Sequence, residues 1–115
     1  MPDITIYHNS RCSKSRNALQ ILEEKGLPFK VRNYLQEPLQ EAEIRQLLKK
    51  LKLPAEALIR KSEPLYKEYF KSTPPDEESC IRAMVLHPQL IERPVVVHGQ
   101  KAVIARPPEK VLDIL

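Results

Sequence analysis

Hydrophobic residues at the start of the chain follow first a strand pattern and then a helix pattern. Residues 4–7 alternate apolar and polar side chains and are rich in β-branched residues, which is typical of a short strand. Apolar residues at helical spacing over 15–25 predict a helix that ends at Gly26. Residues 29–34 have a strand pattern again. We therefore expect a right-handed β-α-β unit with parallel strands.

The middle of the chain has helical patterns. From Glu41 onward, apolar residues recur at i, i+3, i+4 and i+7, and Pro54 ends this amphipathic pattern. These residues are Ile44, Leu47, Leu48 and Leu51. Residues 73–78 offer an N-cap, a proline for the first turn and acidic side chains near the positive end of a helix dipole. They predict a second helix, which is expected to end near His87.

The C-terminal part returns to strand patterns. Residues 95–97 and 102–104 are apolar runs on either side of a short segment, so we expect a hairpin with its turn at or near Gly99. Residues 108–115 are predicted to form a last helix. This order of elements predicts an α/β, thioredoxin-like three-layer fold with a mixed four-stranded sheet and a helical insertion.

Length and composition indicate one cytoplasmic domain. The 115 residues contain no interior linker, so residues 1–115 are expected to fold as a single domain. No apolar stretch approaches the roughly 18 residues that span a membrane, and the N-terminus lacks a signal pattern. Two cysteines are fewer than a secreted domain of this size usually carries. These features predict a cytoplasmic protein without a membrane partner.

The net charge is compatible with several partners. The 19 lysines and arginines exceed the 15 aspartates and glutamates, which gives a net charge of +4. Such an excess suits nucleic acid, an anionic membrane or a small anionic substrate. The basic residues are interleaved with glutamates and few aromatic residues can stack on bases, so no nucleic-acid partner is expected. His87 and His98 lack partners at metal-ligand spacing, so no metal site is expected either.

Cys12 is the candidate nucleophile, and it lies in the polar loop 8–16 between the first strand and the first helix. Unpaired N–H groups and the dipole at a helix N-terminus favour a thiolate and can hold an oxyanion beside it. Neighbouring cations and hydroxyl donors act in the same direction. These neighbours are Arg11, Ser13, Lys14, Ser15 and Arg16. We therefore expect a reactive cysteine rather than a buried packing residue.

A second thiol at the head of this helix is missing. Redox domains of this topology often carry Cys-x-x-Cys, but here Ser15 takes the position of the second cysteine. A covalent intermediate on Cys12 would then need an outside thiol for its release, and glutathione is the abundant cytoplasmic candidate. Cys80 lies in an apolar helical segment and is interpreted as a packing residue. His8 is either a neighbouring cation or base for the thiol, or a structural residue.

Three arginines occur at element boundaries. They are Arg60, Arg93 and Arg106, and the last two directly precede prolines. Planar guanidinium groups bind a tetrahedral oxyanion with paired donors, and residues at strand ends can converge on one cleft. Each arginine taken alone is better explained as a solvated surface charge, and spacing does not decide between the two interpretations.

Residues 4–16, with the sequence ITIYHNSRCSKSR, resemble the active-site signature of the glutaredoxin-linked arsenate reductases. Three later segments resemble motifs of that family in the same order, so the resemblance covers nearly the whole chain. They are residues 58–61, then 87–88 with 92–97, then 106–107 with 111–115. Ser10 stands where the signature commonly has proline, and the chain stops at Leu115, whereas well-established enzymes of this type continue further.

The resemblance implies a reaction and a role for each site residue. The Cys12 thiolate would attack arsenate, glutathione would attack the arsenic–cysteine adduct so that arsenic becomes trivalent, and glutaredoxin would remove the glutathione left on the enzyme. The positions that bind the oxyanion are matched by Arg60, Arg93 and Arg106. His8 and Ser15 match positions that assist the thiolate, and the Arg93–Pro94 bond is expected to be cis. Glutathione is then a co-substrate, and no tightly bound cofactor is expected.

Two other functions compete with arsenate reduction. The family's relatives include thioredoxin-like regulators that bind RNA polymerase and use Cys-x-x-Cys as a redox switch, and Ser15 counts against this function. A thiol reductase that acts on an organic or protein disulfide would share the fold. The three arginines favour an oxyanion substrate instead.

Overall fold

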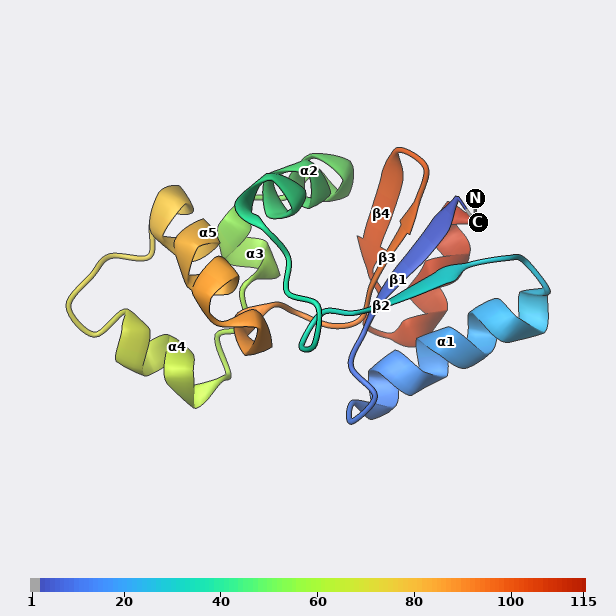
Figure 1. Ribbon diagram of the computed structural model, residues 1–115, viewed down its shortest axis with the longest axis horizontal. Helices are drawn as coiled ribbons and strands as arrows, with labels where there is room; N and C mark the ends of the chain where they lie inside the picture. The colour runs from blue at the N-terminus through green and yellow to red at the C-terminus, as the bar shows by residue number, and fades with distance from the viewer. Residues whose placement is uncertain (1–2) are drawn as a thin grey trace. The chain divides into compact units, whose positions relative to one another are not determined.

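The computed structural model describes residues 3–115, which form two compact units (Figure 1). As far as it is described, unit 1 consists of residues 3–37 together with Arg93–Leu115. Unit 2 is the intervening segment Pro38–Glu92, which is the predicted helical insertion. The single domain expected over residues 1–115 stays a prediction.

Unit 1 contains a mixed four-stranded sheet, as the sequence predicted. Its strands are β1 (Ile4–His8), β2 (Lys30–Asn33), β3 (Val95–His98) and β4 (Lys101–Ile104), arranged in the order β2-β1-β3-β4. β1 runs parallel to β2 and antiparallel to β3, and β3 and β4 form the expected antiparallel hairpin. Helix α1 (Ser13–Lys25) connects the two parallel strands. Gly99 has a φ of 62° in the hairpin turn, a conformation that glycine adopts at little cost.

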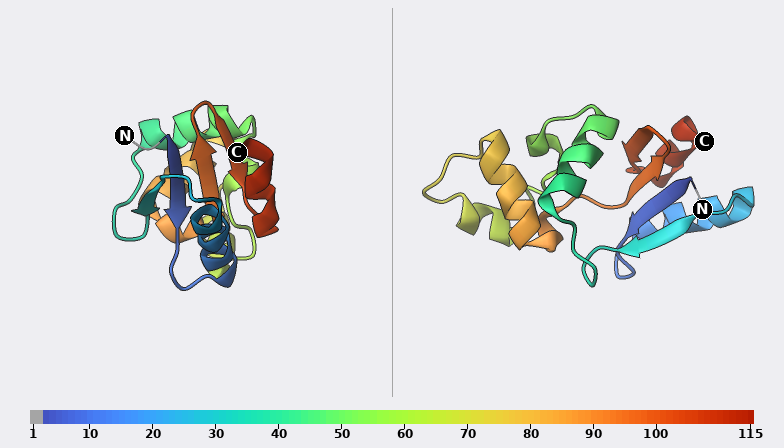
Figure 2. Two further views of the ribbon diagram at one scale, coloured as in Figure 1. Left: turned by 90° about the vertical axis from the view of Figure 1, so that its right-hand side faces the viewer. Right: turned by 45° about the horizontal axis from the view of Figure 1, so that its top comes forward.

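The core of unit 1 lies between the sheet and two helical segments, α1 and the 3₁₀ helix η2 (Pro108–Ile114) (Figure 2). Its buried residues come from β1, α1, β3 and the C-terminal segment: Ile4, Ile6, Ala18, Leu22, Val96, Ala105 and Val111. Because side chains alternate along a strand, His8 points to the same side of β1 as Ile4 and Ile6. The sheet and these helices supply two of the three predicted layers.

The ends of two predicted helices in unit 1 differ from expectation. α1 begins at Ser13 rather than at residue 15, because the backbone already turns at Cys12, which is its N-cap. The last helix is a 3₁₀ helix rather than an α-helix over 108–115. Its inward-facing residues Pro108, Val111 and Ile114 recur every three positions, which matches the three residues per turn of a 3₁₀ helix.

Unit 2 is helical. It contains α2 (Glu41–Leu51), α3 (Ala55–Leu58), α4 (Pro64–Tyr69), α5 (Glu77–Leu86) and the short 3₁₀ helix η1 (Pro88–Leu90). The four apolar residues predicted to face the core of α2 are all buried, and α2 packs against α5. Asp76 is the N-cap of α5, because its Oδ1 accepts the Ser79 N–H at 2.8 Å. The prediction of a proline in the first turn of this helix was therefore wrong, since both prolines precede the cap.

No helix within residues 3–115 is long and apolar enough to cross a membrane.

Candidate active site

Cys12 lies at the N-terminus of α1, where the backbone changes from extended to helical. Its φ and ψ are −96° and 122°, and its carbonyl accepts the Arg16 N–H at 3.1 Å. Its own N–H donates to the Asn9 carbonyl at 3.0 Å and so tightens the preceding loop. As the N-cap residue, Cys12 places its side chain beside the N–H groups of the first helical turn, which have no partner within the helix.

The surroundings of the Cys12 thiol lower its pKa. Burial is the largest single influence and raises the pKa, but several groups together outweigh it. The backbone N–H of Ser15, the Arg93 side chain and the backbone N–H of Lys14 each lower the pKa, and the Arg93 charge adds to their effect. Each of these groups stabilises the thiolate more than the thiol. Cys12 is therefore poised to act as a nucleophile.

The two cysteines are expected to react at very different rates. Cys80 is fully buried in α5, its Sγ donates to the Pro75 carbonyl at 3.6 Å, and burial together with nearby carboxylates raises its pKa. We expect the iodoacetamide alkylation rate of Cys12 to rise with pH through a midpoint below the ordinary thiol value of about 8.5, because alkylation requires the thiolate. Cys80 should stay slow in the folded protein. Peptide mass spectrometry after timed alkylation measures both rates, and a Cys12 midpoint at or above the ordinary value would contradict the activated nucleophile.

Ser15 and His8 form a buried pair behind Cys12. Ser15 Oγ lies 2.7 Å from His8 Nδ1, and the same oxygen accepts the Asn9 N–H at 3.0 Å. The sequence suggested that the Ser15 hydroxyl would donate to the sulfur, but the group of Ser15 that reaches Cys12 is its backbone N–H. The hydroxyl instead fixes the loop against β1 and α1.

The burial of His8 and the nearby Arg16 charge lower its pKa below the ordinary histidine value. This direction favours a neutral imidazole at pH 7 over the positive charge that was one of its expected roles. Its contact with Ser15 links it to the loop that carries Cys12, because the same Ser15 oxygen accepts the Asn9 N–H.

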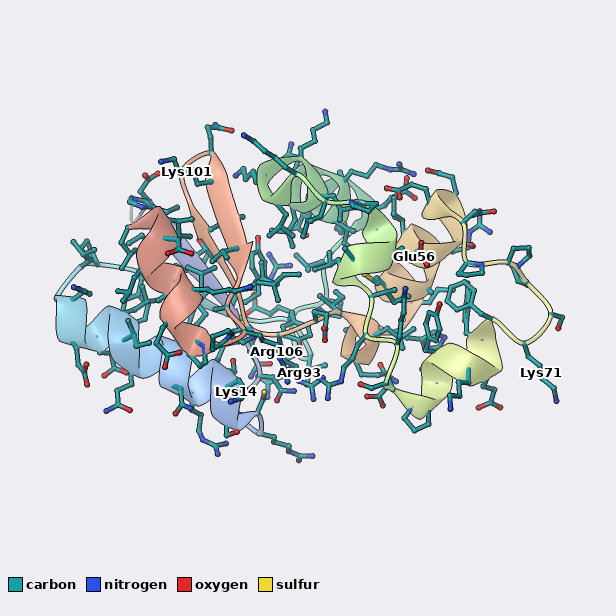
Figure 3. All side chains as sticks on the ribbon, turned by 180° about the vertical axis from the view of Figure 1, so that it is seen from behind. Lys14, Glu56, Lys71, Arg93, Lys101 and Arg106 are labelled. Atoms are coloured by element: carbon teal, nitrogen blue, oxygen red, sulfur yellow. The ribbon has the colours of Figure 1, made fainter. Side chains whose placement is uncertain are left out.

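Arg93 and Arg106 belong to unit 1 and lie together near the start of α1, where Lys14 is also found (Figure 3). Arg106 Nη1 donates to the Arg93 carbonyl at 3.3 Å, and Arg93 contacts the Cys12 sulfur. Within residues 3–115, the buried Nε of Arg93 has no hydrogen-bond partner. The peptide bonds that follow both arginines are cis, the first as the resemblance implied. Two of the three predicted arginines are thus gathered with the thiol.

Arg60 belongs to unit 2, where it follows α3 and forms ion pairs with Glu63 and Glu92. Its backbone N–H donates to the Leu90 carbonyl at 2.6 Å, so its position within unit 2 is fixed. Its approach to the group formed by Cys12, Arg93 and Arg106 stays a prediction.

Sequence reasoning overlooked one residue of the loop, Asn9. Asn9 binds three of its neighbours: its N–H donates to Ser15 Oγ, its carbonyl accepts from Cys12, and its Oδ1 accepts the Arg11 N–H at 3.0 Å. An asparagine that opens a loop is a recognised turn signal, and it could have indicated this role. Arg16 donates to the Ser10 carbonyl at 2.8 Å, and its charge lowers the pKa of His8.

Comparison with known proteins places this site in a family. The ArsC family matches residues 7–114. The chain is 48% identical over 114 residues to the uncharacterized protein YfgD of Escherichia coli K12, covering 97% of this chain and 96% of that protein. It is 42% identical to an arsenate reductase of Neisseria meningitidis serogroup A over 117 residues, the full length of both.

A solved structure shows the same fold. The arsenate reductase from Vibrio cholerae superposes with a TM-score of 0.92 at 41% sequence identity, with 97% of each chain covered. The predicted α/β, thioredoxin-like fold is confirmed by this match. Since the family match spans almost the whole sequence, the chain belongs to the ArsC family.

Proposed function

We propose that the protein is an arsenate reductase that converts arsenate to arsenite with glutathione and glutaredoxin as electron donors. The observation that carries this proposal is the Cys12 thiol, held at a helix N-terminus with Arg93 in contact and Arg106 beside it. Relatives and structural neighbours that carry the name arsenate reductase support the same substrate.

The proposed first step forms a bond between sulfur and arsenic. The Cys12 thiolate attacks the arsenic of arsenate, and one arsenic–oxygen bond breaks, with the oxygen leaving as water after protonation. Arg93 and Arg106, with Arg60 as the third member, would bind the remaining oxygens and offset the negative charge that builds up during the attack. The lowered pKa of Cys12 makes the thiolate available for this step near neutral pH.

The proposed second step reduces the arsenic. A glutathione thiolate attacks the Cys12 sulfur, and the electron pair of the sulfur–arsenic bond stays on arsenic, which leaves as arsenite. The enzyme is left with a disulfide between Cys12 and glutathione. A glutaredoxin thiolate then attacks the glutathione sulfur and releases the Cys12 thiolate. An outside thiol is required because Ser15 occupies the position where a resolving cysteine would stand. Glutathione is abundant in the cytoplasm, so we place the reaction there.

A coupled assay tests the whole proposal. Arsenate, glutathione, glutaredoxin, glutathione reductase and NADPH are mixed with the protein, and NADPH oxidation is followed by absorbance. We expect multiple turnovers that require arsenate, glutathione and the protein, and that slow sharply without glutaredoxin. If NADPH oxidation does not depend on arsenate, arsenate is not a substrate. A thiol reductase would instead consume NADPH with an organic disulfide as the acceptor.

A further inference from the structure

A small pocket of about 180 Å³ lies beside the loop that carries Cys12, and residues of unit 1 form all of it. β1 and β2 are parallel, with His8 paired to Asn33, so the loops that follow them leave the sheet at the same edge. These two loops supply the lining residues, which are Asn9, Ser10, Arg11, Asn33, Leu35 and Gln36. The proposed electron route leaves this pocket without a role.

Hydrogen bonds hold the walls of this pocket in place. The Oδ1 of Asn9 accepts the Arg11 N–H at 3.0 Å, and the Asn9 carbonyl accepts the Cys12 N–H at 3.0 Å. In the other loop, the Asn33 carbonyl accepts the Gln36 N–H at 3.1 Å. Two turns thus form the pocket, and the first of them ends at the residue that carries the thiol.

The lining side chains suit a carboxylate that lies next to a peptide group. Arg11 is exposed and positively charged, and in the described part of the chain its guanidinium forms no ion pair, so it can bind an anion. The side-chain amides of Asn33 and Gln36 each offer a donor and an acceptor, which match the C=O and N–H of a peptide bond. Among residues 3–115, no acidic side chain lines the pocket, so an ammonium group would meet no opposite charge there. The pocket therefore favours the carboxyl end of a peptide over its amino end.

Size and position narrow the ligand further. Pockets that enclose a whole small molecule have volumes of roughly 300 to 1,000 Å³, so this pocket holds only one end of such a ligand. Consecutive Cα atoms lie about 3.8 Å apart, so Arg11 and Cys12 are spaced like neighbouring residues of a bound peptide. A peptide whose thiol-bearing residue precedes its last residue can present the thiol to Cys12 while its carboxylate reaches Arg11. Glutathione has this order, because its cysteine is followed by a C-terminal glycine and its ammonium group lies at the other end.

We propose that this pocket binds the glycine carboxylate of glutathione and so places the glutathione thiol for its attack on the Cys12 sulfur. This inference rests on the proposed function, in which glutathione is the thiol co-substrate. Arg11 binds the carboxylate, and the side-chain amides of Asn33 and Gln36 bind the neighbouring peptide group. These residues select the attacking thiol and take no part in the electron transfer itself.

A disulfide exchange at Cys12 tests the pocket without arsenate. Cys12 is first converted to a mixed disulfide with thiopyridine, and peptide mass spectrometry checks its position. When the glutathione thiolate attacks the Cys12 sulfur, a new sulfur–sulfur bond forms and the pyridinethiolate leaves with the electron pair of the old bond, which absorbance records. The reaction is repeated with glutathione ethyl ester, in which only the glycine carboxylate is blocked. We expect glutathione to react about five times faster than the ester, the factor that a solvent-exposed charged contact can give.

Two variants should remove this preference. Arg11→Gln removes the cation, and Gln36→Glu places a like charge beside the bound carboxylate, so in each variant the ratio of the two rates should fall at least about threefold. Both side chains are exposed, so neither change disturbs the core of unit 1. The ratio compares two thiols on one sample, so a change in the reactivity of Cys12 itself does not move it.

Matched controls separate the pocket from the general charge of unit 1. Gln100→Glu makes the same change at an exposed position of the hairpin turn, and Lys14→Gln removes a positive charge on the other side of Cys12, outside the pocket. Both should keep most of the parent ratio. A parent ratio of one, or an equal fall in Lys14→Gln and Arg11→Gln, would overturn the inference. The coupled assay reports separately on the proposed function, since a protein that prefers glutathione in this exchange but fails to reduce arsenate would overturn only that function.

Discussion

Cys12→Ser is expected to abolish arsenate reduction. A serine hydroxyl stays protonated at neutral pH, so it is a poor nucleophile toward arsenic. It also cannot form a disulfide with glutathione, so both proposed steps lose their reactive atom. Activity in the coupled assay should fall to the background rate. Mass spectrometry of the parent during turnover should find glutathione on Cys12, and none should be found on the variant.

Cys80→Ser is the matched control for this substitution. The Cys80 sulfur is buried and donates to the Pro75 carbonyl, and serine places a smaller hydroxyl donor at the same position. Turnover should stay within a few-fold of the parent if circular dichroism shows an intact fold. A Cys12–Cys80 disulfide that accumulates during turnover, with thioredoxin sufficient and glutathione dispensable, would replace the proposed electron route with an intramolecular one.

Arg93→Ala and Arg106→Ala should each lower kcat/KM by about two to three orders of magnitude, the usual cost of removing one charged donor from a developing oxyanion. The two variants should differ in the pKa of Cys12. Arg93 contacts the sulfur, so its loss should raise the midpoint of alkylation, whereas Arg106 contacts the Arg93 carbonyl and should leave the midpoint almost unchanged.

Lysine at either position should restore only part of the lost activity, because an ammonium group cannot reproduce the paired donors of a guanidinium. Full activity in both Arg93→Lys and Arg106→Lys would remove the arginine clamp from the mechanism.

Local patterns were sufficient to predict most of the fold. The apolar face of α2 was predicted correctly because burial of one helix face imposes a periodicity that the sequence carries by itself. The hairpin was predicted from apolar runs around Gly99 for a similar reason. The 3₁₀ character of η2 was missed because residues three apart line one face of an α-helix as well as of a 3₁₀ helix.

Cys12 could be identified from its loop and its basic neighbours, but its partners could not. Arg93 reaches the thiol from a segment 81 positions later, the difference between positions 12 and 93, and only folding shows this contact. The sequence also placed hydroxyl donors at the sulfur, whereas the Ser15 hydroxyl bonds to His8 seven positions earlier. A sequence pattern gives the type of residue at a site, but it does not show which atom of that residue makes a contact.

The Ser15 hydroxyl also bears on how readily this chain could accommodate a second cysteine beside Cys12. Exchanging Ser15 for cysteine needs only one codon change and would create Cys-x-x-Cys. The side chain is fully buried, however, and its oxygen is shared by His8 and the Asn9 N–H. The larger and weaker-bonding sulfur would leave both partners poorly satisfied. A second cysteine at this position therefore demands coordinated change at His8 and in the loop.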